Sequence, residues 1–413
     1  MKRFRLLLGL LLIVVLLVSC SAFAANVTTV KYWLWMDDVT DQTIPNLIKE
    51  YNSAHPGVNV VMETVPLAQY HDKLINAISA GAAPDVTRFK DWWLGEFAKA
   101  QLVEPLTSYL NKWPARSDVI PKLWDSGKIP GSKVIYMVPH NFVTIYLYYR
   151  ADWFKEAGLE PPTTYDKFLT AAQKLTDPAK NRYGFGLRGG AGGQDAWLAF
   201  MAAQGVRLTD KKGNVIINNQ KAVDANQKFI DLFRKYKVTP PSAPTDAFAQ
   251  ITGAFQAGNT AMFEHHVGSS AGFAAKFGAN LGVVSLPAAD PKKPATMETM
   301  SGHIILASSK VKKEAFQFIT WLTSADQMDK WSRSPGNGQL PVLQSVANRD
   351  FYKNNIFYKT SIDSASTAIG WPATPGVGKL SATTWAIDMQ RALLGEITSK
   401  QMLDDLAKDL KEN

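Results

Sequence analysis

The stretch "YHDKLINAISAGAAPDV", residues 70–86, contains a helix, its stop and the start of a strand within one short run. Its apolar residues Tyr70, Leu74 and Ile78 recur every fourth position, so their side chains share one face of a helix. Gly81 follows at the position where a helix commonly ends in the left-handed conformation. The stretch therefore predicts an amphipathic helix that leads directly into a buried strand.

The residues before this stretch extend the same alternation. "KYWLWMDD", residues 31–38, is expected to be the first strand, and residues 44–51 carry apolar side chains at helical spacing. A β-rich run, residues 58–65, follows the breaker "HPG". The order strand, helix, strand, helix, strand predicts a mostly parallel sheet with right-handed crossovers.

Later segments alternate in the same way, without a linker rich enough in Pro, Gly or Ser to separate independent domains. The expected strands are 134–138, 144–149, 260–264, 281–286 and 304–307. The expected helices are 163–175, 221–237, 312–322 and much of 385–410. Thr163 and Asp166 form a predicted capping box at the start of the first of these helices. We expect an α/β protein of two lobes, with the chain passing between them more than once.

The composition is that of a folded protein with real cores. The chain has 413 residues, of which 46% are hydrophobic and 20% charged, which argues against a disordered or fibrous protein. Twelve tryptophans are many. Because an indole carries an N–H and is seldom completely buried, some of these rings are expected to line grooves or clefts.

The N-terminus is predicted to be an export signal, residues 1–24. Basic residues precede an apolar run, residues 6–18, which is too short to span a membrane. Cleavage after Ala24 and a lipobox ending at Cys20, the only cysteine, remain alternatives. Loss of three basic residues with the leader lowers the formal charge from +9 to +6. The remaining Lys and Arg are dispersed, so we expect no nucleic-acid partner.

Several motifs resemble sites for cofactors or metals without completing them. The glycines of residues 184–189 lack the strand–turn–helix frame of a dinucleotide site. Residues 253–260 match a P-loop except that Asn259 stands where the phosphate-binding lysine is required. His265 and His266 are adjacent on a strand and point to opposite faces, so they cannot readily share a metal. We therefore predict no cofactor, no metal and no catalytic residue.

The resemblance of the chain to a known family rests on five segments in order. Residues 70–86 closely resemble the signature of bacterial extracellular solute-binding proteins of family 1, the sugar-binding subunits of ABC importers. The further similar segments are 145–168, 253–269, 301–327 and 392–410. Arg150 and Ala151 stand where the family often has Asn-Lys, and residues 188–193, "RGGAGG", have no clear counterpart.

The resemblance implies a periplasmic-binding-protein-like fold of type II, with two α/β lobes joined by a hinge of three crossings. The implied crossings lie near Pro139, near residues 281–286 and near residues 340–341. The implied first lobe comprises residues 26–138 plus 283–341, and the second comprises 139–282 plus 342–413. Ligand in the cleft would stabilise the closed form, which the membrane permease then reads.

The function implied is capture of a sugar and its delivery to permease subunits by a monomeric, exported protein. The several rings indicate an oligosaccharide rather than a monosaccharide. Two alternatives stay open. The same fold could bind a polyamine, a polyol phosphate or a peptide. A secreted glycoside hydrolase needs only two opposed carboxylates, which a sequence with 36 acids does not exclude.

The candidate ligand-binding residues combine aromatic rings, which stack on the C–H faces of sugars, with polar groups, which bind hydroxyls. Those expected from the first lobe are Trp35, Asp37, Asp38, Phe89, Asp91, Trp92, Trp93 and His303. Those expected from the second lobe are Asn141, Trp197, Glu264, His265, His266 and Trp371. For each ring the alternative is a place in the core, and for the acids near the first strand it is capping the next helix.

Overall fold

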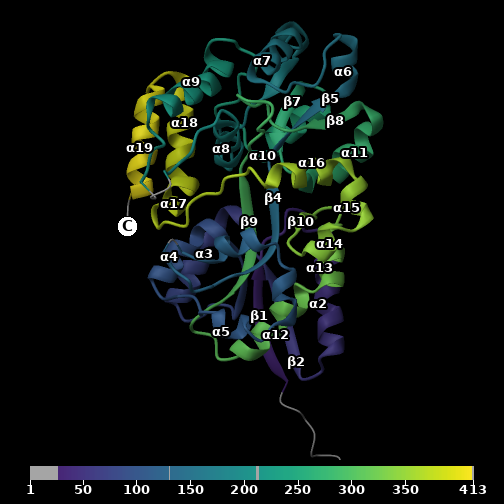
Figure 1. Ribbon diagram of the computed structural model, residues 1–413, viewed down its shortest axis with the longest axis vertical. Helices are drawn as coiled ribbons and strands as arrows, with labels where there is room; N and C mark the ends of the chain where they lie inside the picture. Colours follow the sequence, from purple (N-terminus) through teal and green to yellow (C-terminus); the bar gives the residue numbers. More distant parts are fainter. Residues whose placement is uncertain (1–26, 130, 211–213, 412–413) are drawn as a thin grey trace, which may run out of the picture.

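A computed structural model describes residues 27–129, 131–210 and 214–411. The predicted leader, with Cys20 and Ala24, lies outside these residues. Two α/β lobes are stacked along the long axis of the molecule, as Figure 1 shows. Within the described ranges, no helix has the length and apolar character that crossing a membrane requires.

The first lobe is built on a six-stranded sheet in the order β10-β4-β9-β3-β1-β2. Its strands are β1 (Thr28–Leu34), β2 (Val58–Thr64), β3 (Val86–Lys90), β4 (Val138–Thr144), β9 (Glu298–Ile305) and β10 (Leu340–Pro341). Parallel pairing joins β1 to β2 and β1 to β3, whereas β9 lies antiparallel between β3 and β4. The parallel arrangement predicted from the first three strands is confirmed for them, and the later strands of this sheet pair antiparallel instead. The reason is that β4 leaves for the other lobe and β9 returns from it, without a helical crossover.

The second lobe has a four-stranded sheet in the order β6-β7-β5-β8. Its strands are β5 (Tyr146–Arg150), β6 (Tyr183–Gly186), β7 (Thr260–His265) and β8 (Leu281–Val284). The chain changes sheets between Thr144 and Tyr146, because β4 continues past Pro139 in the first sheet. It returns between Val284 and Glu298.

Helices cover the first sheet as the apolar spacing predicts. They are α2 (Thr43–Ala54), α3 (Leu67–Ser79), α4 (Leu94–Lys99), α5 (Thr107–Leu110), α12 (Lys312–Leu322), α13 (Ala325–Ser332) and α14 (Gln344–Ala347). The buried side chains of α2 are the four expected from its spacing, Ile44, Leu47, Ile48 and Tyr51. Gly81 has a φ of +69°, which confirms the predicted left-handed end of α3.

The helices of the second lobe surround its smaller sheet. They are α6 (Ala151–Glu156), α7 (Tyr165–Lys174), α8 (Gln194–Ala203), α9 (Gln220–Arg234), α10 (Phe248–Ala257), α11 (Ser270–Phe277), α18 (Trp385–Leu394) and α19 (Ser399–Lys411). Helix α7 begins later than expected. Its N-cap is Thr164, whose side chain accepts a hydrogen bond from the Lys167 backbone N–H, and not Thr163.

The segments that join the lobes lie side by side. After α15 (Asp350–Asn354), helix α16 (Ile356–Ala365) crosses the middle of the molecule between the two sheets, contacting β4 and β8 (Figure 1). The chain then reaches α17 (Gly376–Lys379) through a segment that contacts β9, where the Glu298 N–H donates to the Ile369 carbonyl at 2.8 Å. The edges of both sheets therefore face each other across this junction.

Candidate functional site

The ends of β1 and β3 carry the side chains that face the second lobe. Because these strands are parallel, their carboxyl ends share one edge of the sheet. Trp35 follows β1, while Lys90 ends β3 and Trp92 lies in the short 3₁₀ helix η1 (Asp91–Trp93). The Lys90 ammonium Nζ lies 5.3 Å from the centre of the Trp35 ring and 5.0 Å from that of Trp92. Two indoles therefore enclose one cation at this edge.

Lys90 is buried without a direct ion pair. Burial lowers the pKa of its ammonium, and the carboxylate that opposes this effect most is Asp195 of the second lobe. Among the described residues, none places a carboxylate oxygen within 4.0 Å of Lys90. The charge therefore keeps its hydrogen-bond donors available.

Asp195 is held by a tryptophan of the segment that returns from α16. The Trp371 Nε1–H donates to Asp195 Oδ1 at 2.9 Å, and the Trp371 ring stacks on Trp197 at 6.5 Å between centres. Burial raises the pKa of Asp195, while Lys90, Trp371 and Arg188 act in the opposite direction. The carboxylate is thus oriented by one hydrogen bond and keeps accepting capacity for others.

Arg188 lies in the glycine loop before α8. Its Nε and Nη2 donate to the Ala191 carbonyl at 2.9 and 2.6 Å. Burial lowers the pKa of Arg188 to about 10, with Asp195 opposing this shift. Gly192 has a φ of +79°, and a side chain there would reach to 2.0 Å from Arg188 Nη2. The loop needs glycine at that position because it wraps closely around the guanidinium.

His266 also connects electrostatically to the first lobe. Its Nδ1 accepts a hydrogen bond from the Gly268 N–H at 3.0 Å. Burial lowers the pKa of His266 to about 4; Asp37 of the first lobe opposes this shift, and Lys90 adds to it. The imidazole is therefore neutral at physiological pH. Asp37 itself is exposed.

These side chains form what we call the interlobe cluster. Its members are Asp37, Lys90, Trp92, Arg188, Asp195, His266 and Trp371. Three come from the first lobe and four from the second lobe and the returning segment. Flat rings, a carboxylate oriented by an indole, one buried cation and one half-buried cation suit a polar solute with apolar faces. Among the residues that the structure describes, no group of three His, Cys, Asp or Glu is placed to hold a metal ion.

Several predicted rings are packed into the cores of the lobes. The Trp35 ring packs edge-to-face on Tyr70, with 5.3 Å between ring centres. Its contact with the cluster is the cation–π contact with the Lys90 ammonium. Trp93 and Phe89 pack against each other at 5.5 Å between ring centres. Trp197 is fully buried, with its Nε1–H donating to Asn226 Oδ1 at 2.8 Å. Phe89, Trp93 and Trp197 are placed as core residues.

Three predicted polar residues have structural partners. The Asp91 carboxylate accepts from the backbone N–H groups of Trp92 and Met300, and burial raises its pKa to about 7. Asp38 Oδ1 accepts from the Thr40 N–H at 2.8 Å. His303 is fully buried, with Nε2 at 2.9 Å from the Tyr32 hydroxyl. These geometries favour structural roles for all three.

Asn141, Glu264 and His265 are buried with polar atoms left over. Both side-chain amide atoms of Asn141, Glu264 Oε2 and His265 Nε2 have no hydrogen-bond partner among the described residues. Burial alone raises the pKa of Glu264 to about 8, and burial lowers the pKa of His265. Buried polar groups normally have a hydrogen-bond partner, and a ligand would supply one. Their contact with ligand stays a prediction.

The pattern-based selection of residues missed Lys90, Arg188 and Asp195. Lys90 is the residue between the predicted Phe89 and Asp91, and its position at a strand end was the available signal. Arg188 begins the glycine loop "RGGAGG" and Asp195 follows it by two residues, and the absence of a family counterpart for this loop was the signal that the sequence offered. Their proximity depends on how the two lobes pack together. The positions of strand ends within one lobe do not predict that packing.

Comparison with known proteins identifies relatives over most of the chain. The sequence profile of bacterial extracellular solute-binding proteins matches residues 37–329. A solved ABC transporter solute-binding protein of Thermotoga lettingae, bound with α-D-tagatose, superposes with a TM-score of 0.83 at 25% identity. That superposition covers 93% of this chain and 98% of the other.

Two curated relatives extend the comparison to named ligands. The erythritol/L-threitol-binding protein of Mycolicibacterium smegmatis is 26% identical, over 89% of this chain and 82% of the relative. The maltotriose-binding protein of Pyrococcus abyssi is 25% identical, over 79% of this chain and 69% of the relative. The ligands named for these relatives are thus a small polyol and an oligosaccharide.

Proposed function

Because this chain belongs to the family of bacterial extracellular solute-binding proteins, we propose that it captures a sugar or a polyol between its lobes for an ABC importer. The ligand would bind at the interlobe cluster and be delivered to the permease subunits in the membrane. Relatives that bind tagatose, maltotriose and erythritol or threitol support this class of ligand.

The observation that carries the proposal is that Lys90 and Asp195 interact electrostatically from the two lobes without forming a direct ion pair. Each comes from a different lobe and lies beside an indole: Trp92 lies beside Lys90, which is buried, and Trp371 beside Asp195, which is half-buried. A hydroxyl can accept from an ammonium and donate to a carboxylate at the same time. A ring or chain of hydroxyls would therefore bridge the two lobes and stabilise the closed form.

The remaining parts of the proposal concern the chain as a whole. The resemblance implied lobes of residues 26–138 plus 283–341 and residues 139–282 plus 342–413. The first of these boundaries would move to the end of β4, because residues 138–144 pair within the sheet of the first lobe, and the last would lie beyond Tyr352, whose hydroxyl donates to Asp329. The protein would act as an exported monomer without catalysis. Its leader would be cleaved after Ala24, or Cys20 would carry a lipid anchor.

A thermal-shift panel tests the ligand class. D-Tagatose, erythritol, mannitol and maltotriose represent sugars and polyols, while spermidine, glycerol 3-phosphate and a tripeptide represent the alternatives. A ligand at 100 times its Kd stabilises the native state by about 2.7 kcal/mol, which raises the melting temperature. A shift with spermidine, glycerol 3-phosphate or the peptide and none with any carbohydrate would refute the proposal.

Turnover is checked on the same samples. Chromatography of maltotriose after long incubation should recover it intact. Release of glucose or maltose would instead favour the glycoside hydrolase.

A further inference from the structure

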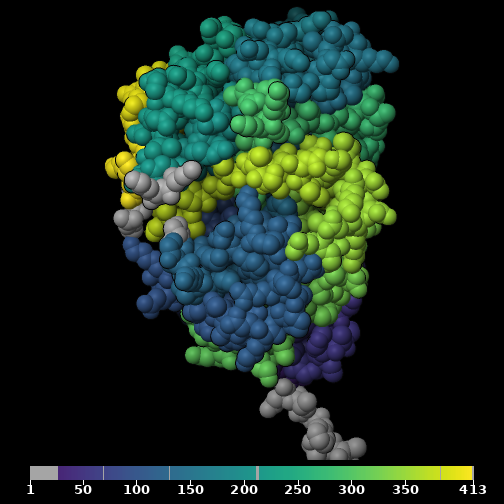
Figure 2. Space-filling model, in the orientation of Figure 1, coloured from purple at the N-terminus to yellow at the C-terminus, as the bar shows by residue number. Residues whose placement is uncertain are grey.

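A second hollow lies on the first lobe, outside the interlobe cluster. It is formed by the end of α5 and by the 3₁₀ helices η2 (Pro114–Asp118) and η3 (Pro121–Gly127), and its volume is about 550 Å³. Pockets of roughly 300–1,000 Å³ hold small molecules. The blue segment of Figure 2, to which these residues belong, covers much of the visible face of the first lobe.

Two indoles line the hollow. Trp113 and Trp124 meet edge-to-face at 6.5 Å between ring centres, with an interplanar angle of 81°. Both are only half-buried. Neither indole N–H donates to any residue that the structure describes. The pair therefore offers apolar surface together with two hydrogen-bond donors.

Arg116 adds a cation to the same wall. Its guanidinium carbon lies 5.8 Å from the centre of the Trp124 ring, and its Nη1 donates to Asn111 Oδ1. Within the described ranges, Nε and Nη2 of Arg116 have no acceptor. A guanidinium that presents two donors in one plane matches the two oxygens of a carboxylate.

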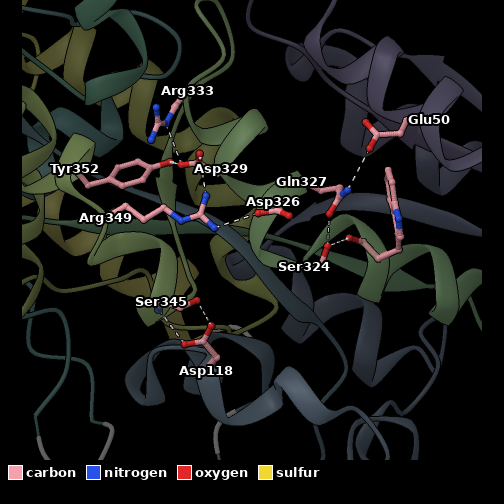
Figure 3. A network of polar contacts seen from close by, with 11 residues as sticks. Glu50, Asp118, Ser324, Asp326, Gln327, Asp329, Arg333, Ser345, Arg349 and Tyr352 are labelled. Carbon is pink, nitrogen blue, oxygen red and sulfur yellow. Dashed lines mark hydrogen bonds and ion pairs between the residues drawn. The ribbon is translucent and has the colours of Figure 1, made fainter.

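Two prolines and hydrogen bonds to residues 342 and 345 hold the walls of the hollow in place. Pro114 and Pro121 start η2 and η3, where their fixed φ suits the first turn. The Ile120 N–H donates to the Val342 carbonyl at 2.9 Å, next to β10. The Asp118 carboxylate accepts from both the N–H and the hydroxyl of Ser345, as Figure 3 shows. The Asp118 carboxylate is therefore occupied by Ser345 and does not line the hollow. Arg116 is the charged residue that lines it.

We propose that this hollow is a second binding site, specific for an acidic saccharide such as a uronic acid. The indoles would stack on the C–H face of the sugar ring, their N–H groups would bind hydroxyl oxygens, and Arg116 would bind the carboxylate. The formal charge of the chain, +9 in all and +6 without the three basic residues of the leader, favours anionic ligands at the surface. The site does not depend on the ligand of the interlobe cluster.

Fluorine NMR of the full chain labelled with 5-fluorotryptophan tests the site. Trp113→Phe and Trp124→Phe identify the two resonances, and phenylalanine keeps most of the packing. D-Glucuronate should shift both resonances in a saturable way. D-Glucose should bind about tenfold more weakly, because it lacks the carboxylate, and acetate should shift neither resonance.

Three variants separate this site from its alternatives. Arg116→Met should weaken glucuronate binding about tenfold, whereas Lys112→Met, an exposed neighbour outside the hollow, should not change it. Trp371→Ala, in the interlobe cluster, should leave the two shifts intact. The inference is overturned if glucuronate moves neither resonance, if glucose binds equally well, or if the shifts disappear in Trp371→Ala.

Discussion

Two groups of charges in this molecule contrast in how they are satisfied. The outer network of the first lobe, drawn in Figure 3, comprises Asp326, Asp329, Arg333, Arg349 and Tyr352. Asp329 accepts from the Tyr352 hydroxyl at 2.7 Å and from Arg333 Nε at 3.0 Å, and it lies 3.0 Å from Arg349 Nη1. Every member of this network has a partner within the protein.

The interlobe cluster shows the opposite arrangement. Lys90 is buried and Asp195 half-buried, each is the opposite charge that acts most strongly on the pKa of the other, and the two form no direct ion pair. Burial of an unpaired charge destabilises the native state unless something else compensates for it. The contrast teaches that charges in direct ion pairs here support the fold, whereas opposite charges that face each other without a direct ion pair mark where a solute is expected.

The largest expected effect concerns Glu264, which is buried near the end of β7 and whose Oε2 has no hydrogen-bond partner in the described part of the chain. Its pKa rises from 4.5 to about 8 on folding, because burial disfavours the carboxylate. Between these pH values the unfolded chain has released the proton while the native state retains it. Stability is therefore highest at low pH and falls by about 1.4 kcal/mol per pH unit as the pH rises through this window.

Urea unfolding from pH 5 to pH 8 measures this dependence. Glu264→Gln removes the ionisable group, so the variant should lose the downward slope and exceed the wild type in relative stability at pH 8. If the unfolding free energies of wild type and variant change with pH in parallel, Glu264 is ionised in the native state. Burial would then not raise its pKa, and this prediction would be wrong.

A smaller effect is expected from Lys90→Met, which replaces the buried ammonium by an apolar chain of similar length. Affinity for the carbohydrate found in the thermal-shift panel should fall by about 2 kcal/mol, since hydrogen bonds to charged groups contribute roughly that much. The free energy of unfolding should stay equal or rise, because the desolvated charge is gone. Calorimetric titration and urea unfolding measure the two quantities.

Lys330→Met is the matched control for this variant. Lys330 is half-exposed and pairs with Glu50 at 2.7 Å on the outside of the first lobe. Its loss should change the unfolding free energy by less than about 1 kcal/mol and leave affinity unchanged. Equal losses of affinity in both variants would remove Lys90 from the binding site.

Much of the fold follows from local patterns. The apolar spacing of α2 and the glycine after α3 were sufficient to predict both helices. The direction of β9 was not predictable in that way, because it depends on the chain returning from the other lobe. Strand direction is a property of the connection, and the sequence of a strand does not encode it.

The candidate site was predictable only in part. Trp371 and Asp37 were expected on residue type and position, and the structure brings them toward the cluster. Trp197 has the same residue type and lies in the core, where its N–H is satisfied by Asn226. Ring type alone does not separate these cases, since an indole can either line a site or fill a core.

The smallest of these effects is expected from Asp329→Asn in the outer network. The amide keeps an oxygen for Tyr352 or Arg333 but loses the charge that Arg349 pairs with. Because the carboxylate is mostly buried and serves three partners, the unfolding free energy should fall by about 1 kcal/mol. Affinity for the carbohydrate should not change, since these residues lie on the first lobe away from the interlobe cluster. Weaker binding by Asp329→Asn at unchanged stability would mean that paired charges also serve the ligand, and the distinction between the two groups would fail.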